Sequence, residues 1–250
     1  QQCTPNAFGA SQCQLGAGEI TAILLGDSHA QSTAAALMLE TDQAALGWAR
    51  AGCPTLIEFQ MNNKEVERDC KAFNAEKFAI LQTEHQGVPL FLFSRAALYT
   101  DPRRHSGYSL YFEGVQDQGS RAFKQRFIQA YTDTVCMLAS HRPVYIVKPI
   151  PEMPFSVYKG LNLQARVLGI KADISTPLAG YLARNRLALS AMDTAAATCN
   201  AKVIDPVPYL CPDGKCMGSK GGVPLYFDDN HLIDAGNEQL RGLFKGTLAR

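Results

Sequence analysis

The chain has 250 residues, and 46% of them are hydrophobic, which is enough to bury a substantial core in one large or two small domains. Its 24 basic and 23 acidic residues give a net charge of +1, and this near-balance argues against a nucleic-acid partner, which requires a basic surface. No apolar run reaches the ~18 residues of a membrane-spanning helix. Residues 1–18 are polar and contain Pro, Gly and Ser. We interpret them as a linker from a longer chain, and residues 19–250 as one domain.

The first regular element is expected to begin at Ile20. The mostly apolar run from Ile20 to Leu25 predicts a fully buried strand. Gly26 and Asp27 end this strand, and Ser28 opens an alanine-rich stretch with helical character. A serine at such a junction stands on a sharp turn, beside the unpaired amides of the first helical turn. Those amides can donate hydrogen bonds to a developing oxyanion.

Short apolar runs then alternate with longer stretches at helical spacing. The expected strands are 44–49, 88–93, 143–148 and 202–205, and the expected helices are 62–86, 120–141, 177–200 and 234–249. This alternation predicts an α/β fold with a five-stranded parallel sheet and helices on both faces. Residues 101–119 form a polar excursion, which is either a lid or substrate loop or a surface loop without a role.

A second reactive segment, Tyr-Phe-Asp-Asp-Asn-His-Leu, lies at residues 226–232. A serine hydroxyl needs a base to take its proton, and the base needs an acidic group to orient it. His231 is the expected base, and Asp228, three residues earlier, is the expected orienting carboxylate for a Ser28 nucleophile. Asp229 and Asp205 are the competing carboxylates.

Eight cysteines are an even and high number for this length, and favour an oxidising compartment. Sequence alone does not fix their connectivity. We favour pairing between neighbours, which gives Cys3–Cys13, Cys53–Cys70, Cys136–Cys199 and Cys211–Cys216. A zinc site at Cys211 and Cys216 is the alternative, although a second close cysteine pair is missing.

The Gly-Asp-Ser at 26–28 after a strand, with Asp-x-x-His at 228–231, resembles the SGNH/GDSL hydrolase family. An α/β-hydrolase elbow is less fitting, because in that fold the acid and the histidine come from separate loops. Further motifs are Gly-Cys-Pro at 52–54, Ser-Arg at 94–95, Pro-Ile-Pro-Glu at 149–152 and the Cys211…Cys216 pair. The whole set, over roughly 19–248, resembles the periplasmic SGNH domain fused to membrane acyltransferase-3 proteins, which O-acetylate surface polysaccharides. This resemblance implies a three-layer α/β/α, flavodoxin-like fold.

The expected oxyanion hole departs from the general family pattern. That pattern joins the serine amide to a glycine amide and an asparagine side chain. Here the amides of Ser28 and Gly52 fit the first two places, with Gly47 as a weaker alternative to Gly52. The Gly-x-Asn-Asp block is absent, and Arg95 follows the third strand instead. Arg95 either donates to the oxyanion or to an acceptor hydroxyl, or is a salt-bridged structural residue.

The resemblance implies O-acetyl transfer to hydroxyls of a bacterial surface polysaccharide, such as an O-antigen, through an acyl-serine. The acetyl group, ultimately from acetyl-CoA, would be delivered by an amino-terminal acyltransferase-3 membrane domain of the same chain. We therefore expect a monomeric periplasmic domain of an inner-membrane protein, with no bound cofactor or metal. Tyr108 and Tyr111 are possible sugar-stacking residues, whereas Trp48 fits a core position. The alternatives are a carbohydrate O-acetylesterase of the same family and a non-catalytic glycan-binding module.

Overall fold

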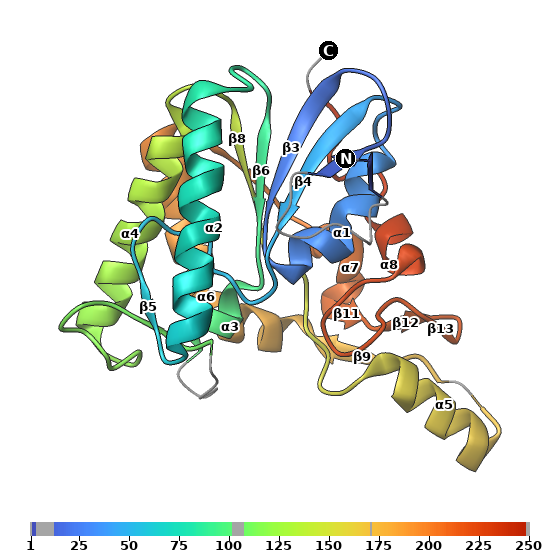
Figure 1. The fold of residues 1–250 in the computed structure, drawn as a ribbon. Helices are drawn as coiled ribbons and strands as arrows, with labels where there is room; N and C mark the ends of the chain where they lie inside the picture. Colours follow the sequence, from blue (N-terminus) through green and yellow to red (C-terminus); the bar gives the residue numbers. More distant parts are fainter. Residues whose placement is uncertain (1, 4–12, 102–107, 171, 249–250) are drawn as a thin grey trace.

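A computed structural model describes residues 2–3, 13–101, 108–170 and 172–248. Five parallel strands form the centre of its main sheet, in the spatial order β4, β3, β6, β8, β10. They are β3 (Ile20–Gly26), β4 (Ala44–Ala49), β6 (Leu90–Phe93), β8 (Val144–Val147) and β10 (Lys202–Ile204). The predicted α/β fold with a parallel sheet is confirmed, and each expected strand is present (Figure 1).

The sheet is wider than predicted. β2 (Cys13–Leu15) pairs antiparallel with β4, and β1 (Gln2–Cys3) pairs with β2, so seven strands are joined in the described part of the chain. Residues 13–15 lie in the segment that the sequence suggested as a linker, yet the side chain of Leu15 is fully buried. Its burial in the core at this edge stabilises the attachment of the amino-terminal segment.

Helices cover both faces of the sheet, which gives the expected three layers (Figure 1). The long ones are α1 (Ser28–Met38), α2 (Lys64–Thr83), α4 (Arg121–Ala139), α5 (Val157–Leu168) and α6 (Leu178–Cys199). The short ones are α3 (Ala96–Thr100), α7 (Val207–Leu210), α8 (Asp234–Gln239) and the 3₁₀ turn Pro212–Gly214. Along β3, Ile23 and Leu25 join the core under α2 and α4, while Ala22 and Leu24 join the core under α1 and α8. This alternation follows from the two-residue period of a strand.

Small strand pairs complete the structure outside the main sheet. They are β5 (Gln60–Met61) with β7 (Leu110–Tyr111), β9 (Ser175–Pro177) with β11 (Lys215–Met217), and β12 (Ser219–Lys220) with β13 (Val223–Pro224). Part of the polar excursion is therefore fixed to the segment before α2. Among the described residues, no helix has the length and apolar character that a membrane span requires.

Most helix boundaries lie within three residues of the prediction, but the last one is wrong. The predicted helix over 234–249 ends at Gln239, and successive turns follow it. Those turns bring Leu243 and Phe244, which are neighbours in sequence, both into the core. One face of a continuing helix would bury such adjacent side chains less completely.

Three of the predicted disulfides are present. Cys53–Cys70 joins the loop after β4 to α2, Cys136–Cys199 joins the ends of α4 and α6, and Cys211–Cys216 closes a short loop. Because Cys211 and Cys216 are joined in a disulfide, the alternative of a zinc site at these two cysteines is wrong. The predicted Cys3–Cys13 pair involves the Cys3 side chain, which lies outside the described side chains.

Candidate active site

Ser28 is the first residue of α1 and follows β3 after a single residue, Asp27. The Oδ1 atom of Asp27 accepts a hydrogen bond of 2.8 Å from the amide of His29, which caps the helix. A Cβ atom at Gly26 would lie 1.8 Å from the carbonyl oxygen of Phe93 in β6. The turn therefore requires glycine before Asp27, because β6 approaches it too closely for a side chain.

The buried Asp27 carboxylate also connects this turn to the end of β6. Its Oδ2 atom accepts hydrogen bonds from the amide of Arg95, at 2.9 Å, and from the hydroxyl of Tyr99, at 2.6 Å. Burial, together with the adjacent carboxylate, raises the pKa of Tyr99 well above its ordinary value, so this phenol stays protonated as a donor. Asp27 therefore braces the turn that carries Ser28.

The side chains of Ser28, His231 and Asp228 form a continuous chain of hydrogen bonds. Ser28 Oγ lies 2.9 Å from His231 Nε2, and His231 Nδ1 lies 2.7 Å from Asp228 Oδ2. Asp228 Oδ1 accepts the backbone amides of Asn230 and His231, each at 2.8 Å. Partial burial opposes ionisation of Asp228, but these hydrogen bonds outweigh it and hold its pKa well below the ordinary range. A charged Asp228 fixes the proton of His231 on Nδ1 and leaves Nε2 free to accept the serine proton.

The Pro-Ile-Pro-Glu segment after β8 supports the loop that carries this histidine. The carbonyl oxygen of Pro151 accepts a 2.9 Å hydrogen bond from the hydroxyl of Tyr226. The amide of Met153 donates to the carbonyl of Asp229 at 2.7 Å, and that of Val157 to the carbonyl of Asp228 at 2.9 Å. Asp228 is thus held through its own carbonyl and through hydrogen bonds of Tyr226 before it and Asp229 after it.

His29 is fully buried behind the nucleophile, with its ring centroid 5.4 Å from that of His231. Its Nε2 donates to Asn230 Oδ1 at 3.0 Å, and Asn230 Nδ2 donates to Asp229 Oδ1 at 2.7 Å. Burial lowers the pKa of His29, against the opposing effect of the Asp27 charge, so this ring is neutral. His29 therefore positions the Asn230 turn and does not contact the nucleophile hydroxyl.

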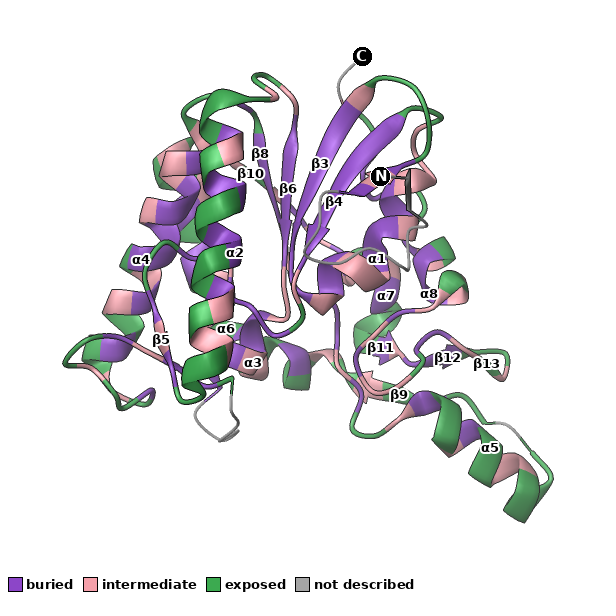
Figure 2. Cartoon of the chain, viewed as in Figure 1, coloured by how far each residue is buried: buried purple, intermediate pink, exposed green. Residues whose placement is uncertain are grey.

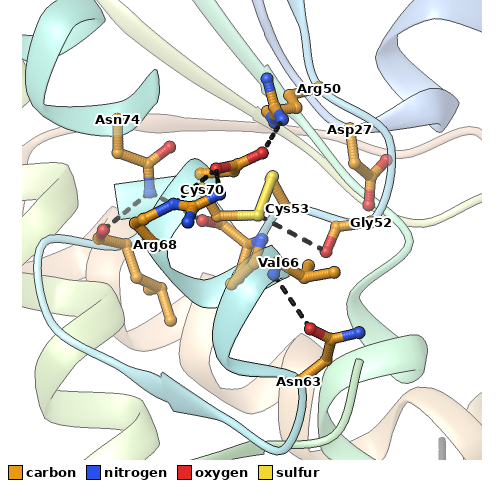
Figure 3. Close-up of a disulfide and its surroundings, with 12 residues drawn as sticks. Asp27, Arg50, Gly52, Cys53, Asn63, Val66, Arg68, Cys70 and Asn74 are labelled. Carbon is orange, nitrogen blue, oxygen red and sulfur yellow. Dashed lines mark hydrogen bonds and ion pairs between the residues drawn. A yellow bond between two sulfur atoms is a disulfide. The ribbon is translucent and has the colours of Figure 1, made fainter. Parts of the chain in front are cut away.

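The turn with Gly52 lies next to the end of β3, since the amide of Arg50 donates to the carbonyl of Gly26 at 3.1 Å. The disulfide of Cys53 and the ion pair of Arg50 with Asp69, at 2.6 Å, fix this turn to α2 (Figure 3). Gly52 has φ of 72°, a conformation that favours glycine. A Cβ atom there would lie 2.2 Å from the Tyr108 ring, so that ring packs directly on Gly52.

Arg95 is held by the carboxylate of Glu152, whose side chain is only 3% exposed. Arg95 Nε donates to Glu152 Oε2 at 3.0 Å, its Nη2 contacts the same oxygen, and Arg184 Nη2 lies 2.9 Å from it. Burial opposes the charge of Arg95, but the carboxylate outweighs this effect and raises the pKa of the guanidinium. Arg95 therefore has the geometry expected of a salt-bridged structural residue. Donation from Arg95 to an oxyanion or to an acceptor hydroxyl stays a prediction.

Two comparisons with known proteins bear on this site. A family model described as "SGNH domain (fused to AT3 domains)" matches residues 2–246. The chain belongs to this SGNH domain family. At the level of the family, membership indicates acyl transfer or ester hydrolysis. No curated protein sequence matches the chain.

A solved structure confirms the SGNH fold. The periplasmic domain of a lipopolysaccharide acetyltransferase from Salmonella ser. Paratyphi A superposes with a TM-score of 0.60 over 92% of this chain and 84% of that one. The two sequences are 15% identical, so the likeness concerns the fold.

A hollow of about 460 Å³ in this SGNH domain opens beside Ser28 and His231. Its walls include Gln31 and Ser32 of α1 and the side chain of Phe227, which is 68% exposed. Phe227 does not stand out in the sequence as a site residue, although its place directly before Asp228 was a signal.

Of the aromatic residues singled out from the sequence, only Tyr108 lies near the expected oxyanion hole, through its contact with Gly52. Tyr111 lies in β7, where its hydroxyl contacts Lys64, and it lines a different hollow with Asn62. Trp48 is fully buried, as a core residue should be. A stacking role for Tyr108 or Tyr111 stays a prediction.

Proposed function

We propose that this SGNH domain transfers an acyl group through an acyl-serine, with Ser28 as nucleophile, His231 as base and Asp228 as orienting acid. The observation that supports this proposal is the hydrogen-bonded chain from Ser28 Oγ through His231 to Asp228. This chain of hydrogen bonds ends on the hydroxyl of Ser28 at the amino terminus of α1, where backbone amides are available to an anion.

In the proposed reaction, His231 Nε2 takes the proton of Ser28 as Oγ attacks the acyl carbonyl. The amide of Ser28, and that of Gly52 on its constrained turn, would donate to the tetrahedral oxyanion. His231 then returns the proton to the departing oxygen, which leaves an acyl-serine. An incoming hydroxyl, deprotonated in turn by His231, attacks that ester and carries the acyl group away.

The incoming hydroxyl in this proposal belongs to a bacterial surface polysaccharide, and the acyl group is acetyl. Two findings support it: the family's fusion to AT3 domains, and the structural likeness to the periplasmic domain of a lipopolysaccharide acetyltransferase. The AT3 domain of the same chain would deliver the acetyl group, ultimately from acetyl-CoA, so this domain would need no cofactor. The three disulfides suit a periplasmic location. We propose that the domain acts there as a monomer.

A carbohydrate O-acetylesterase is the second candidate, because His231 is about one-third exposed and water can reach the site. Hydrolysis of p-nitrophenyl acetate tests the chemistry common to both functions. We expect wild type to hydrolyse it and Ser28→Ala to lose at least 10³-fold in kcat/KM, on the order seen for catalytic triads. Ser140→Ala is the matched control, because Ser140 lies at the far end of α4. Equal hydrolysis by wild type and Ser28→Ala would refute the proposed nucleophile.

A second assay separates the transferase from the esterase. Acetylation of the surface polysaccharide is measured in cells that carry either the full protein with its AT3 domain or the SGNH domain alone. The transferase predicts acetylated glycan only with the full protein. The esterase predicts release of acetate from acetylated glycan by the isolated domain.

A further inference from the structure

Helix α5 projects from the body of the domain on the side of the candidate active site (Figure 1). It follows Ser156 and is held at its start by the hydrogen bond from the amide of Val157 to the carbonyl of Asp228. Only Val157 and Leu161 of this helix are buried, and most of its remaining surface is exposed (Figure 2). Most of the surface of α5 is therefore open to solvent.

One face of α5 carries a regular row of polar and aromatic side chains. Tyr158, Asn162 and Arg166 are spaced four residues apart, so they lie along a single stripe about 12 Å long. Lys159 lies beside this stripe. Together with Phe227 they line a groove of about 740 Å³ between the helix and the 226–232 loop.

This groove and the hollow beside Ser28 share one wall, the side chain of Phe227. Asp228, whose carboxylate contacts His231, also lines the groove. A chain seated along α5 and crossing Phe227 would therefore reach the surface next to Ser28. A single small ester needs only the inner hollow, whereas an extended molecule could use the whole path.

The chemistry of the groove fits a carbohydrate. The rings of Tyr158 and Phe227, which are 53% and 68% exposed, offer flat apolar surfaces for the C–H faces of sugar rings. The Asn162 amide can donate to and accept from hydroxyls, and Arg166 and Lys159 add two positive charges against the single negative charge of Asp228. We propose that this groove binds the acceptor glycan and favours one that carries carboxylate groups. The proposal rests on the proposed function, since it names where and what the acyl acceptor binds.

The test measures glycan binding on the Ser28→Ala protein, so that binding is separated from chemistry. Two probes of equal length are titrated by calorimetry: an oligosaccharide of a polyuronate and a neutral glucan oligosaccharide. We expect the polyuronate to bind at least tenfold more tightly than the glucan, with the difference decreasing as salt screens the basic residues. Tyr158→Ala should weaken binding of the polyuronate at least tenfold. Arg166→Gln should remove most of the preference for the polyuronate.

Leu182→Ala is the control, because Leu182 is also an exposed apolar residue but lies on α6, and it should leave glycan affinity unchanged. Tyr158 is a surface residue, so circular dichroism and thermal melting of its variant should match those of the parent. Absence of binding by both oligosaccharides, or equal affinity in the Tyr158→Ala and Leu182→Ala proteins, overturns the proposal. So does binding to phosphatidylglycerol vesicles that Tyr158→Ala abolishes, because α5 would then be a lipid-binding helix. If the wild-type protein, which retains Ser28, does not hydrolyse the ester, the proposed function is refuted instead.

Discussion

Arg95 donates through Nε to Oε2 of the buried Glu152, at 3.0 Å, and Arg184 approaches the same oxygen. This ion cluster joins the two parts of the candidate active site. The amide of Arg95 is bound by Asp27, which caps the helix of the nucleophile, and Glu152 precedes Met153, which supports the histidine loop. The cluster therefore links the turn that carries Ser28 to the loop that carries His231.

Glu152→Gln should destabilise the domain by about 3–5 kcal/mol, because removal of one partner leaves buried charges without compensation. The free energy of unfolding from urea denaturation measures this loss. Glu238→Gln is the control, since its pair with Arg241 is exposed and should contribute less than about 1 kcal/mol. Similar losses in the two variants would show that the Glu152 cluster is not a structural link.

Asp228→Asn should lower kcat for ester hydrolysis by about 10³-fold or more, because an amide can no longer hold the His231 proton on Nδ1. Asp205→Asn tests the competing carboxylate, which contacts Lys148 and the amide of Val207. It should retain most of the activity. A larger loss of kcat in Asp205→Asn than in Asp228→Asn would show that Asp205, and not Asp228, orients His231.

His29 should make the stability of the domain depend on pH below neutrality. Its pKa is lowered in the folded state, so the unfolded chain binds more protons as the pH falls below 6.5. The free energy of unfolding must then decrease with falling pH, by at most about 1.4 kcal/mol per pH unit, until the folded-state pKa is reached. Denaturation curves at pH 7.5 and 5.0 should show a smaller decrease for His29→Gln than for wild type. Parallel decreases would mean that His29 titrates alike in both states.

The disulfides allow stability and activity to be separated. Loop entropy predicts a loss of about 4 kcal/mol for Cys136→Ser/Cys199→Ser, whose cysteines are 63 residues apart, and about 3 kcal/mol for Cys53→Ser/Cys70→Ser, 17 residues apart. We expect only the second variant to lower kcat, since its disulfide holds the turn of Gly52. Thermal melting measures the loss of stability. Ester hydrolysis, assayed at a temperature below the melting transitions of both variants, measures the effect on kcat. Unchanged kcat without Cys53–Cys70 would argue against Gly52 as an oxyanion donor.

The sequence alone determined the alternation of strands and helices, because apolar spacing and Gly or Pro breaks are local properties of the chain. It also singled out Ser28, Asp228 and His231, since each motif is short and its residue types are those that the chemistry needs. The three described disulfides followed from pairing each cysteine with the next one along the chain.

Only the tertiary structure decided which distant side chains meet. Ser28 and His231 are 203 positions apart in sequence, so no local rule limits their distance, which depends on how the last loop packs on the Pro-Ile-Pro-Glu segment. The spacing of apolar residues likewise did not predict that Arg95 pairs with Glu152, 57 residues away, or that α5 projects beside Phe227. Local patterns fix the elements and their chemistry, whereas contacts between loops are set by packing energies that arise only as distant segments of the chain come together.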